Sequence, residues 1–145
     1  MARLLSQEGW QVHSISRRPC DVPGVSSHLF DLAEPPQAHA AAAQIIQSLG
    51  RSSGRSATGG GSKFTVVHNA STHFEDSVLD LDSEKMTAAL AVSAVSPAIL
   101  TSALLPHMGP GSSVIFVGST LSEKAVAGRS SYVTAKHATL GLMRT

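Results

Sequence analysis

The sequence of 145 residues contains little cysteine, no marked excess of charge and no recognisable leader. Its one cysteine, Cys20, allows no internal disulfide and is compatible with a reducing compartment. The formal net charge of +1 gives no electrostatic reason to expect binding to nucleic acid or to a membrane surface. The first residues lack the basic-then-apolar order of a signal peptide, and no apolar run is expected to span a membrane. These absences favour a cytoplasmic protein.

The histidines do not indicate a metal site, although there are seven of them. Zinc ligands normally occur in closely spaced pairs, and these residues are scattered along the chain. They are His13, His28, His39, His68, His73, His107 and His137. His68 ends an apolar run, and we expect it to be a packed core histidine.

Strand and helix signals alternate along the chain. Short apolar or β-branched runs predict strands at 11–16, 26–30, 64–68 and 114–118. Longer amphipathic or apolar stretches predict helices at 35–49, 83–107 and 130–144, with a bend near Pro97. Such alternation is typical of an α/β fold with a parallel sheet and helices on both faces. Residues 50–62, rich in glycine and serine, are expected to form a flexible insertion in a single domain covering 1–145.

Tyr132, Lys136 and Ser119 form the most informative pattern in the sequence. Tyr132 and Lys136 stand four residues apart in Y-V-T-A-K, so on a helix they lie on one face, one turn apart. A nearby ammonium group favours the ionised form of a phenol and makes it usable as a general acid/base near neutral pH. Ser119 follows the apolar run 114–118, where a hydroxyl at a strand end could meet the same substrate oxygen. The set is suited to proton transfer at an alcohol or carbonyl oxygen.

Several segments together resemble the short-chain dehydrogenase/reductase family. Val66 to Ser71 (V-V-H-N-A-S) resembles the strand that ends in the family's N-N-A-G turn, with His68 at the first Asn and Ser71 at the Gly. The stretches 91–97 and 103–108 resemble the family's long dimer-forming helix, and 10–18 and 28–32 resemble its second and third strands. With the spaced Ser, Tyr and Lys in the same order, the resemblance covers essentially the whole chain. It implies a Rossmann-like doubly wound parallel sheet.

The resemblance also implies roles for the catalytic candidates. Ser119 would hydrogen-bond the substrate carbonyl, Tyr132 would transfer the proton, and Lys136 would assist the tyrosine and hold the nicotinamide ribose. Ser93 stands where the family usually has an active-site Asn that anchors a water in the proton relay. Other interpretations remain open: a surface pair for Tyr132 and Lys136, a turn serine for Ser119, and capping or packing for Ser93.

A second group of residues is implied to bind the cofactor. In such folds an acidic residue after the second strand receives the ribose 2′-hydroxyl of NAD, whereas an arginine accommodates the 2′-phosphate of NADP. Ile15 is followed by Ser16, Arg17 and Arg18 with no acid, which favours NADP over NAD unless the two arginines are merely solvated. Asp31 and Leu32 would lie near the adenine ring, although Asp31 could equally be a polar loop residue. Asn69, Ala70 and Ser71, with Tyr132 and Lys136, complete the predicted cofactor set.

The sequence lacks two parts of the family pattern. No glycine cluster of the form T-G-x-x-x-G-x-G, which seats a pyrophosphate at a helix N-terminus, occurs in the first thirty residues. The later strands and the substrate-covering loop are also absent, so we expect an incomplete sheet. In the doubly wound order the first strand lies between the second and the fourth. Its absence predicts two half-sheets with unpaired edges and a chain of low stability, unless the halves close on each other.

Two functional hypotheses follow. The first is an NADP-dependent oxidoreductase acting on a small carbonyl or alcohol substrate, with no nucleic-acid or membrane partner. Its full-length form is expected to be a homo-oligomer that associates through the helices 83–107 and 130–144. The second is a catalytically inactive, truncated pseudo-enzyme of the same family that acts as an interaction module.

Overall fold

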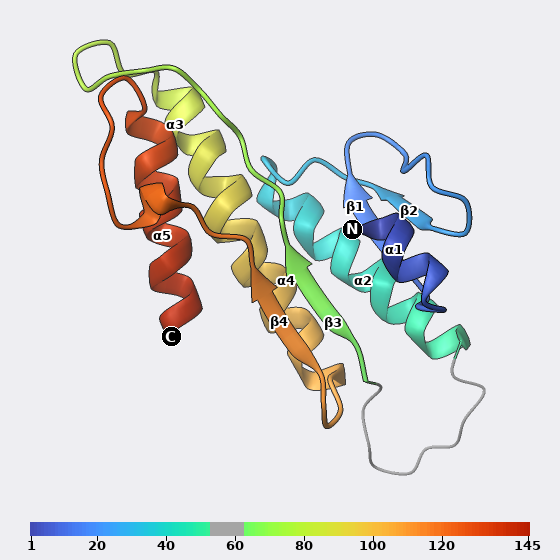
Figure 1. The fold of residues 1–145 in the computed structure, drawn as a ribbon. Coiled ribbons are helices and arrows are strands. Elements are labelled where there is room, and N and C mark those ends of the chain that lie inside the picture. The colour runs from blue at the N-terminus through green and yellow to red at the C-terminus, as the bar shows by residue number, and fades with distance from the viewer. Residues whose placement is uncertain (53–62) are drawn as a thin grey trace.

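The computed structural model describes residues 1–52 and 63–145 and shows an α/β chain with parallel strands (Figure 1). The N-terminal part contains α1 (Ala2–Gln7), β1 (His13–Ser16), β2 (Ser26–Leu29) and α2 (Pro35–Ser52). The remainder contains β3 (Thr65–His68), α3 (Ser83–Leu90), α4 (Ser96–Leu104), β4 (Ser113–Phe116) and α5 (Ser130–Arg144). Short helical segments join them: the π-helical η1 (Ala91–Val95) and the 3₁₀ helices η2 (Leu105–His107) and η3 (Thr120–Ser122).

The strands form two separate two-stranded parallel sheets. β1 pairs with β2 from His13 opposite Ser26 to Ser16 opposite Leu29, and β3 pairs with β4 from Thr65 opposite Ser113 to His68 opposite Phe116. In the described part of the chain, no backbone hydrogen bond joins β1 to β3. The expectation of two half-sheets is confirmed, and the halves do not close on each other by strand pairing.

The hydrogen-bond register shows which backbone groups remain on the free edges. The carbonyl oxygens of Phe64 and His68 accept hydrogen bonds from the N–H groups of Ser113 and Val117, respectively. Along a parallel strand, the backbone groups of successive residues point alternately to one side and the other. The N–H and C=O groups of Thr65 and Val67 therefore point away from β4. By the same argument the backbone of Ile15 points away from β2, because Ser16 accepts from Phe30 and Val12 accepts from Ser26. Each sheet thus presents one edge strand toward the other half (Figure 1).

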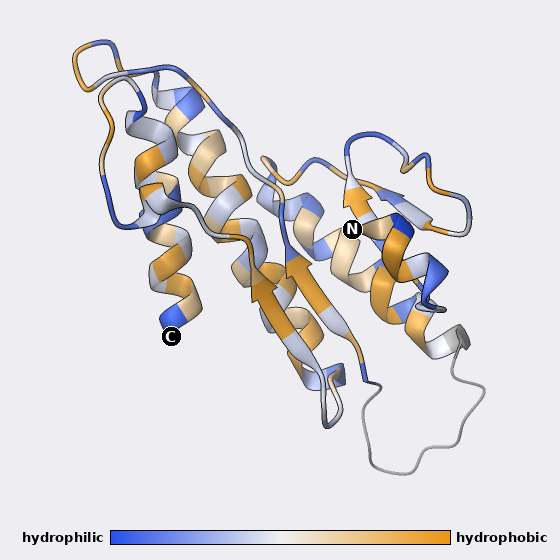
Figure 2. Ribbon diagram, in the orientation of Figure 1, coloured by the Kyte–Doolittle hydropathy of each residue, from blue (hydrophilic) through white to orange (hydrophobic). Residues whose placement is uncertain are grey.

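Packing between α2 and α4 joins the two halves. The buried contact is made by three alanines of α2, Ala38, Ala41 and Ala42, and by Leu100 of α4. Small side chains let the two helices approach closely, and partly buried apolar residues pack around them: Ile15, Phe30, Leu32, Ile99 and Ala103. β3 and β4 are also hydrophobic along much of their length (Figure 2).

A polar contact also fastens α2 to the β1–β2 sheet. The rings of His13 and His28 stack with centroids 5.2 Å apart, and His13 Nδ1 lies 3.0 Å from His28 Nε2. His28 Nδ1 in turn lies 3.1 Å from Gln44 Oε1 of α2. Burial, together with the neighbouring His28, lowers the pKa of His13 below its ordinary value.

A single buried serine ties α4 to the loop that precedes α2. The Ser96 side chain is fully buried, and its hydroxyl donates a hydrogen bond of 2.7 Å to the Leu32 carbonyl oxygen. Leu32 therefore packs against the α2–α4 core through its side chain and is held to α4 through its backbone.

The long helical stretch 83–107 is interrupted before the proline rather than at it. The π-helical segment Ala91–Val95 lies between α3 and α4, and Pro97 lies within the first turn of α4. Pro97 has no N–H to donate to the carbonyl of Ser93 four residues earlier. The hydroxyl of Thr139 on α5 donates to that carbonyl instead, at 2.8 Å.

One expectation about this stretch needs correction. Ser83–His107 is 25 residues long and contains an 18-residue window that is apolar enough, by length and composition alone, to cross a membrane. In the structure 44% of that window is buried, because the stretch packs against α2 and α5. Core helices of soluble proteins pass the same test, so the finding is weak evidence for a membrane span.

The predicted elements agree in type with the observed ones and differ mainly at their ends. α2 continues to Ser52, three residues beyond the predicted helix and into the predicted insertion at 50–62. The rest of that insertion, 53–62, lies outside the described residues.

His68 is packed as expected of a core histidine. Its Nε2 lies 2.8 Å from the Thr101 hydroxyl of α4, and its ring packs against Phe116 with centroids 4.7 Å apart. Burial lowers the pKa of His68 from 6.5 to about 4, because the charged imidazolium is poorly solvated there.

Replacing Ser96 by alanine should leave the Leu32 carbonyl without its partner. We expect Ser96→Ala to lower the free energy of unfolding by about 1–2 kcal/mol, measured by urea denaturation. Ser102→Ala, on the exposed side of the same helix, is the matched control and should change stability by less than about 0.5 kcal/mol. Equal effects of the two variants would contradict a structural role for the Ser96–Leu32 bond.

The burial of His68 predicts a loss of stability in acid. Since the folded-state pKa of about 4 lies below the unfolded value of 6.5, the unfolded chain binds the proton first as the pH falls. The free energy of unfolding should therefore decrease between pH 6.5 and 4, by about 2–3 kcal/mol after allowance for partial exposure. In His68→Gln this part of the pH dependence should vanish, whereas His39→Gln on the exposed side of α2 should keep it. Parallel stability–pH curves for parent and His68→Gln would refute the assignment.

Candidate active site

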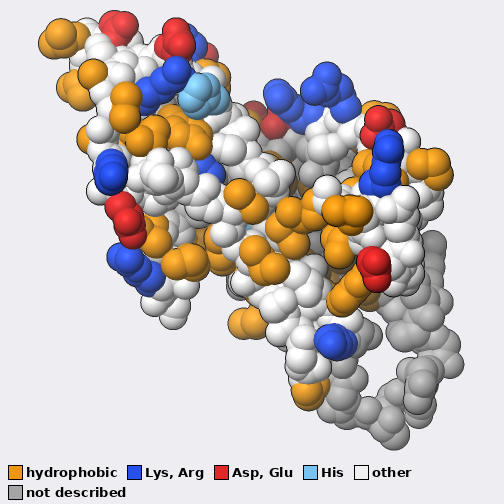
Figure 3. Space-filling view, in the orientation of Figure 1, with side chains coloured by type: hydrophobic (Ala, Val, Ile, Leu, Met, Phe, Trp, Pro, Cys, Tyr) orange, Lys and Arg blue, Asp and Glu red, His pale blue; other side chains and the backbone are white. Residues whose placement is uncertain are grey.

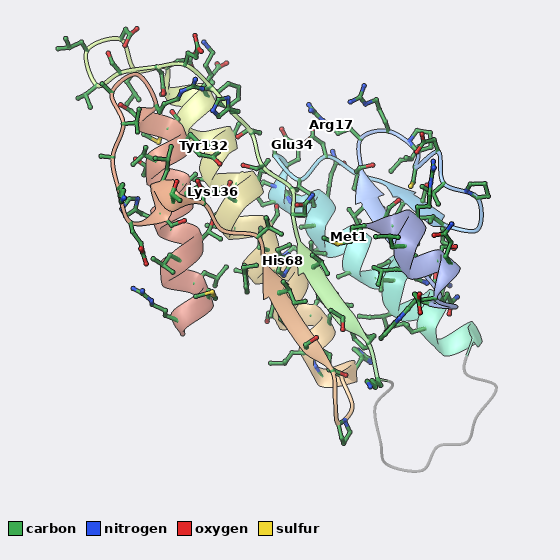
Figure 4. The ribbon with its side chains drawn as sticks, viewed as in Figure 1. Met1, Arg17, Glu34, His68, Tyr132 and Lys136 are labelled. Carbon is green, nitrogen blue, oxygen red and sulfur yellow. The ribbon has the colours of Figure 1, made fainter. Side chains whose placement is uncertain are left out.

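Tyr132 and Lys136 lie together on α5, as the sequence predicts. The Lys136 ammonium nitrogen is 5.7 Å from the centroid of the Tyr132 ring (Figure 4). Lys136 is only 4% exposed, and its Nζ donates a 3.0 Å hydrogen bond to the Val117 carbonyl oxygen just beyond β4. The lysine is therefore held between the end of a strand and the tyrosine ring.

Ser119 lies shortly after the end of β4 and is the N-cap residue of the short helix η3. Its hydroxyl accepts a bond of 3.1 Å from the Leu121 N–H, and its own N–H donates to the Ser122 hydroxyl at 3.3 Å. η3 packs against α5, which brings Ser119 to the helix that carries Tyr132. Within the described ranges no hydrogen bond joins the hydroxyls of Ser119 and Tyr132.

Ser93 is buried in the π-helical segment η1. Its carbonyl oxygen accepts the hydroxyl of Thr139, which lies one helical turn beyond Lys136 on the buried face of α5. π-helical turns recur at functional sites, and the carbonyl of this one is hydrogen-bonded to α5. The structure thus brings Ser93 to the same helix as Tyr132 and Lys136.

Two residues beside Tyr132 were missed in the sequence. The His73 ring stands edge-on to Tyr132, with centroids 5.0 Å apart and an interplanar angle of 84°. Arg129 Nη1 lies 2.9 Å from His73 Nδ1, and Arg129 Nη2 pairs with Glu75 at 3.3 Å. Neither His73 nor Arg129 belongs to a spaced motif. Only their positions, just after β3 and just before α5, could have suggested them.

Asp76 is a third residue that sequence reasoning missed. It is buried, and its carboxylate accepts hydrogen bonds from the backbone N–H and the hydroxyl of Ser131, at the start of α5. The sequence held no signal for this contact, because 55 residues separate the two partners.

The predicted phosphate contacts lie at the end of β1. Arg17 and Arg18 are exposed and, with Ser16 and Pro19, line an open hollow of about 330 Å³. Basic side chains project at this end of the β1–β2 sheet (Figure 3), and Arg17 lies at the same end of the molecule as Tyr132 (Figure 4). Asp31 forms a turn in which its carboxylate accepts from the Ala33 N–H at 2.9 Å.

The remaining predicted cofactor residues follow β3. Asn69, Ala70 and Ser71 are all exposed, and they come directly after the strand. Because the strands of each sheet are parallel, their carboxyl ends lie together at the same end of that sheet. Arg17 and Arg18 follow β1 and Asn69 to Ser71 follow β3, so the two sets lie at the ends of different half-sheets.

These residues fit a phosphorylated nucleotide in charge and position. The hollow beside β1 is lined by two guanidinium groups and no acid, and guanidinium groups suit bidentate binding of phosphate. Exposed polar residues at the carboxyl ends of parallel strands are where ligands bind in open α/β sheets. No group of three potential metal ligands occurs among residues 1–52 and 63–145.

Comparison with known proteins gives one family match and many structural matches. The family model described as enoyl-(acyl carrier protein) reductase matches residues 1–145. No curated protein sequence matches the chain significantly.

Solved structures share the fold at low sequence identity. A metagenomic short-chain oxidoreductase in complex with NADP has a TM-score of 0.80 at 21% identity, over 99% of this chain and 65% of that one. Aldohexose dehydrogenase from Thermoplasma acidophilum in ligand-free form has a TM-score of 0.81 at 20% identity, over 97% of this chain and 52% of that one. An alcohol dehydrogenase from the archaeon Thermococcus sibiricus with 5-hydroxy-NADP has a TM-score of 0.79 at 17% identity, over 99% and 62% of the respective chains.

The chain spans about half to two thirds of the length of these structures. The family model covers it from end to end, and the Tyr132–Lys136 pair lies on one helix beside the end of β4. The chain belongs to the short-chain dehydrogenase/reductase family.

Proposed function

We propose that this chain carries the proton-transfer site of an NADP(H)-dependent oxidoreductase acting on a small carbonyl or alcohol substrate. The observation that supports this most is the buried Lys136, whose ammonium group is fixed by the Val117 carbonyl close to the Tyr132 ring. A buried charge needs a polar partner, so the lysine is confined to this position rather than free in solvent.

The nicotinamide, when bound, supplies or accepts the hydride. In the reducing direction the Tyr132 hydroxyl gives its proton to the substrate oxygen, and in the oxidising direction it takes a proton from the alcohol. Lys136 favours the ionised form of Tyr132 through its nearby positive charge. Ser119 donates a hydrogen bond to the same oxygen, and this requires its hydroxyl to rotate its proton toward the substrate while accepting from Leu121. Ser93, at the position where the family usually has an Asn, would anchor a water in the proton relay.

The proposed preference for NADP rests on the end of β1. Arg17 is the main contact for the 2′-phosphate and Arg18 the second, because no acid competes in that hollow. Asp31 and Leu32 border the adenine, and Asn69, Ala70 and Ser71 support the cofactor from β3. Neighbours of the same fold with bound NADP or a derivative of it support this choice.

We further propose that the protein is cytoplasmic and that its full-length form is a homo-oligomer associating through the helical stretch 83–107 and α5. The alternative is a family member without redox activity that acts as an interaction module. The family match does not favour this alternative.

Nucleotide binding tests the cofactor assignment directly. We expect the purified chain to bind NADPH more tightly than NADH, measured by enhancement of nicotinamide fluorescence. Arg17→Ala should weaken NADPH binding about tenfold and change NADH binding little, because only NADPH carries the 2′-phosphate. Arg144→Ala, a distant exposed arginine on α5, is the control. Equal losses for both nucleotides in Arg17→Ala would remove Arg17 from the 2′-phosphate site.

Removing one hydroxyl tests the catalytic assignment. Tyr132→Phe should reduce turnover, followed as NADPH oxidation with a panel of small ketones and aldehydes, by about 10²–10⁴-fold. NADPH affinity should stay within about twofold, because the ring remains against Lys136 and His73. Thr134→Ala on the exposed face of the same helix should retain full turnover. If the folded parent chain neither binds NADPH nor turns over any substrate, the inactive alternative is correct.

A further inference from the structure

Asp76 is the one acidic side chain that is buried in the described part of the chain, being 5% exposed. It belongs to the loop between β3 and α3, and it is not part of any motif that the sequence displays. A buried carboxylate requires hydrogen-bond donors, since an unpaired buried charge is costly. The donors found here all come from the start of α5.

The contact involves both the backbone and the side chain of Asp76. The Asp76 N–H donates to the Gly128 carbonyl at 3.2 Å, and the Ser130 N–H donates to the Asp76 carbonyl at 3.1 Å, forming an isolated parallel bridge. The Ser131 N–H donates to Asp76 Oδ1 at 3.0 Å and to Oδ2 at 3.3 Å, and the Ser131 hydroxyl donates to Oδ2. Ser131 is itself fully buried, so these bonds are shielded from water.

These bonds replace the ordinary cap of the helix. The first four N–H groups of an α-helix have no partner within the helix, and a side chain at the preceding position usually accepts one of them. At α5 that position is Arg129, which makes no side-chain capping bond. Asp76 instead accepts the N–H groups of Ser130 and Ser131 from a distant segment, and its negative charge lies where the helix dipole favours it.

The residue that follows Ser131 is Tyr132. The short segment 73–76 therefore acts on Tyr132 twice, since Asp76 fixes the turn on which the tyrosine stands and the His73 ring stands against the phenol ring. Arg129 and Glu75 form a further ion pair between the same two segments. Lys136, which is tied to the chain just beyond β4, also lies near the tyrosine ring.

We propose that Asp76 is a positioning residue that fixes the start of α5, and with it the place of the Tyr132 ring beside His73 and Lys136. As a contribution to proton transfer this inference rests on the function proposed for Tyr132. The placement of the ring is a property of the folded chain and can be measured without turnover.

The test separates positioning from general stability by comparing two helix caps. Asp76→Ala removes the acceptor at α5, whereas Asp76→Asn carries the same charge as Asp76→Ala but keeps an oxygen for the Ser131 N–H. Asp82→Ala is the matched control, because Asp82 caps α3 by accepting from Glu84 N–H at 2.9 Å and Lys85 N–H at 3.1 Å. Two readouts are used: hydrogen exchange of the Ser130 and Ser131 amides, and the nuclear Overhauser effect between the rings of His73 and Tyr132. Tyr132 is the only tyrosine of the chain, which makes its ring signals unambiguous.

We expect Asp76→Ala to accelerate exchange of the Ser131 amide by about tenfold or more and to abolish the His73–Tyr132 Overhauser effect. Asp76→Asn should keep the His73–Tyr132 Overhauser effect. Asp82→Ala should keep both the slow Ser131 amide exchange and the Overhauser effect, even if it unfolds at the same urea concentration as Asp76→Ala. A retained Overhauser effect and unchanged exchange in Asp76→Ala would overturn the proposal. If Asp76→Ala does not fold, Ser131→Ala is measured in its place. This variant removes only the hydroxyl that donates to Asp76 Oδ2, so amide exchange at position 131 should accelerate by about threefold.

Turnover distinguishes failure of this inference from failure of the proposed function. If the parent chain reduces carbonyl substrates, Asp76→Ala should lower kcat about tenfold with KM nearly unchanged, since substrate contacts remain and only the proton-transfer group moves. If the parent chain shows no turnover, the proposed function fails, while amide exchange and the ring contact still decide the role of Asp76.

Discussion

The packing of α2 against α4 is the contact on which the rest of the structure depends. In the described part of the chain the two half-sheets share no backbone hydrogen bond, so their relative position is set by the alanine face of α2 on Leu100 and its neighbours. Dispersion and apolar burial at that contact therefore hold the two halves together, whereas continuous strand pairing does so in a complete sheet. The buried Ser96 hydroxyl adds a directional bond across the same junction.

The two halves differ in what they contribute to the site. The half built from β3, β4 and the helices α3 to α5 holds Tyr132, Lys136, Ser119 and Ser93, and hydrogen bonds and helix packing tie their segments together. Arg17, Arg18, Asp31 and Leu32 belong to the other half. The proposed proton-transfer residues thus lie within one packed unit, whereas the proposed nucleotide contacts are divided between the two halves. The contacts around Tyr132 and Lys136 therefore do not depend on pairing between the two half-sheets.

Much of this arrangement was predictable from local patterns. Alternating strand and helix signals predicted the order of the elements, and the four-residue spacing of Tyr132 and Lys136 predicted their common face on a helix. The absence of a glycine-rich turn predicted the split sheet, because the order of strands in a doubly wound fold leaves a gap at that place. Element ends were less predictable. The three extra residues of α2 and the π-helical turn before Pro97 are not marked by the hydrophobic periodicity of the sequence.

The sequence by itself determined the class of fold through its alternating strand and helix signals, and the four-residue spacing of Tyr132 and Lys136 determined that they share one helix face. The family followed from the resemblance of its motifs. Only the tertiary structure decided what surrounds that pair. Asp76 and Ser131 are 55 residues apart, and His73 reaches Tyr132 from a different segment. The carbonyl that holds Lys136 belongs to a strand end 19 residues earlier. The Asp76 carboxylate, the His73 ring and the Val117 carbonyl belong to no periodic sequence pattern. Their partners are determined by the tertiary fold, because leaving a buried donor or acceptor unpaired would cost free energy.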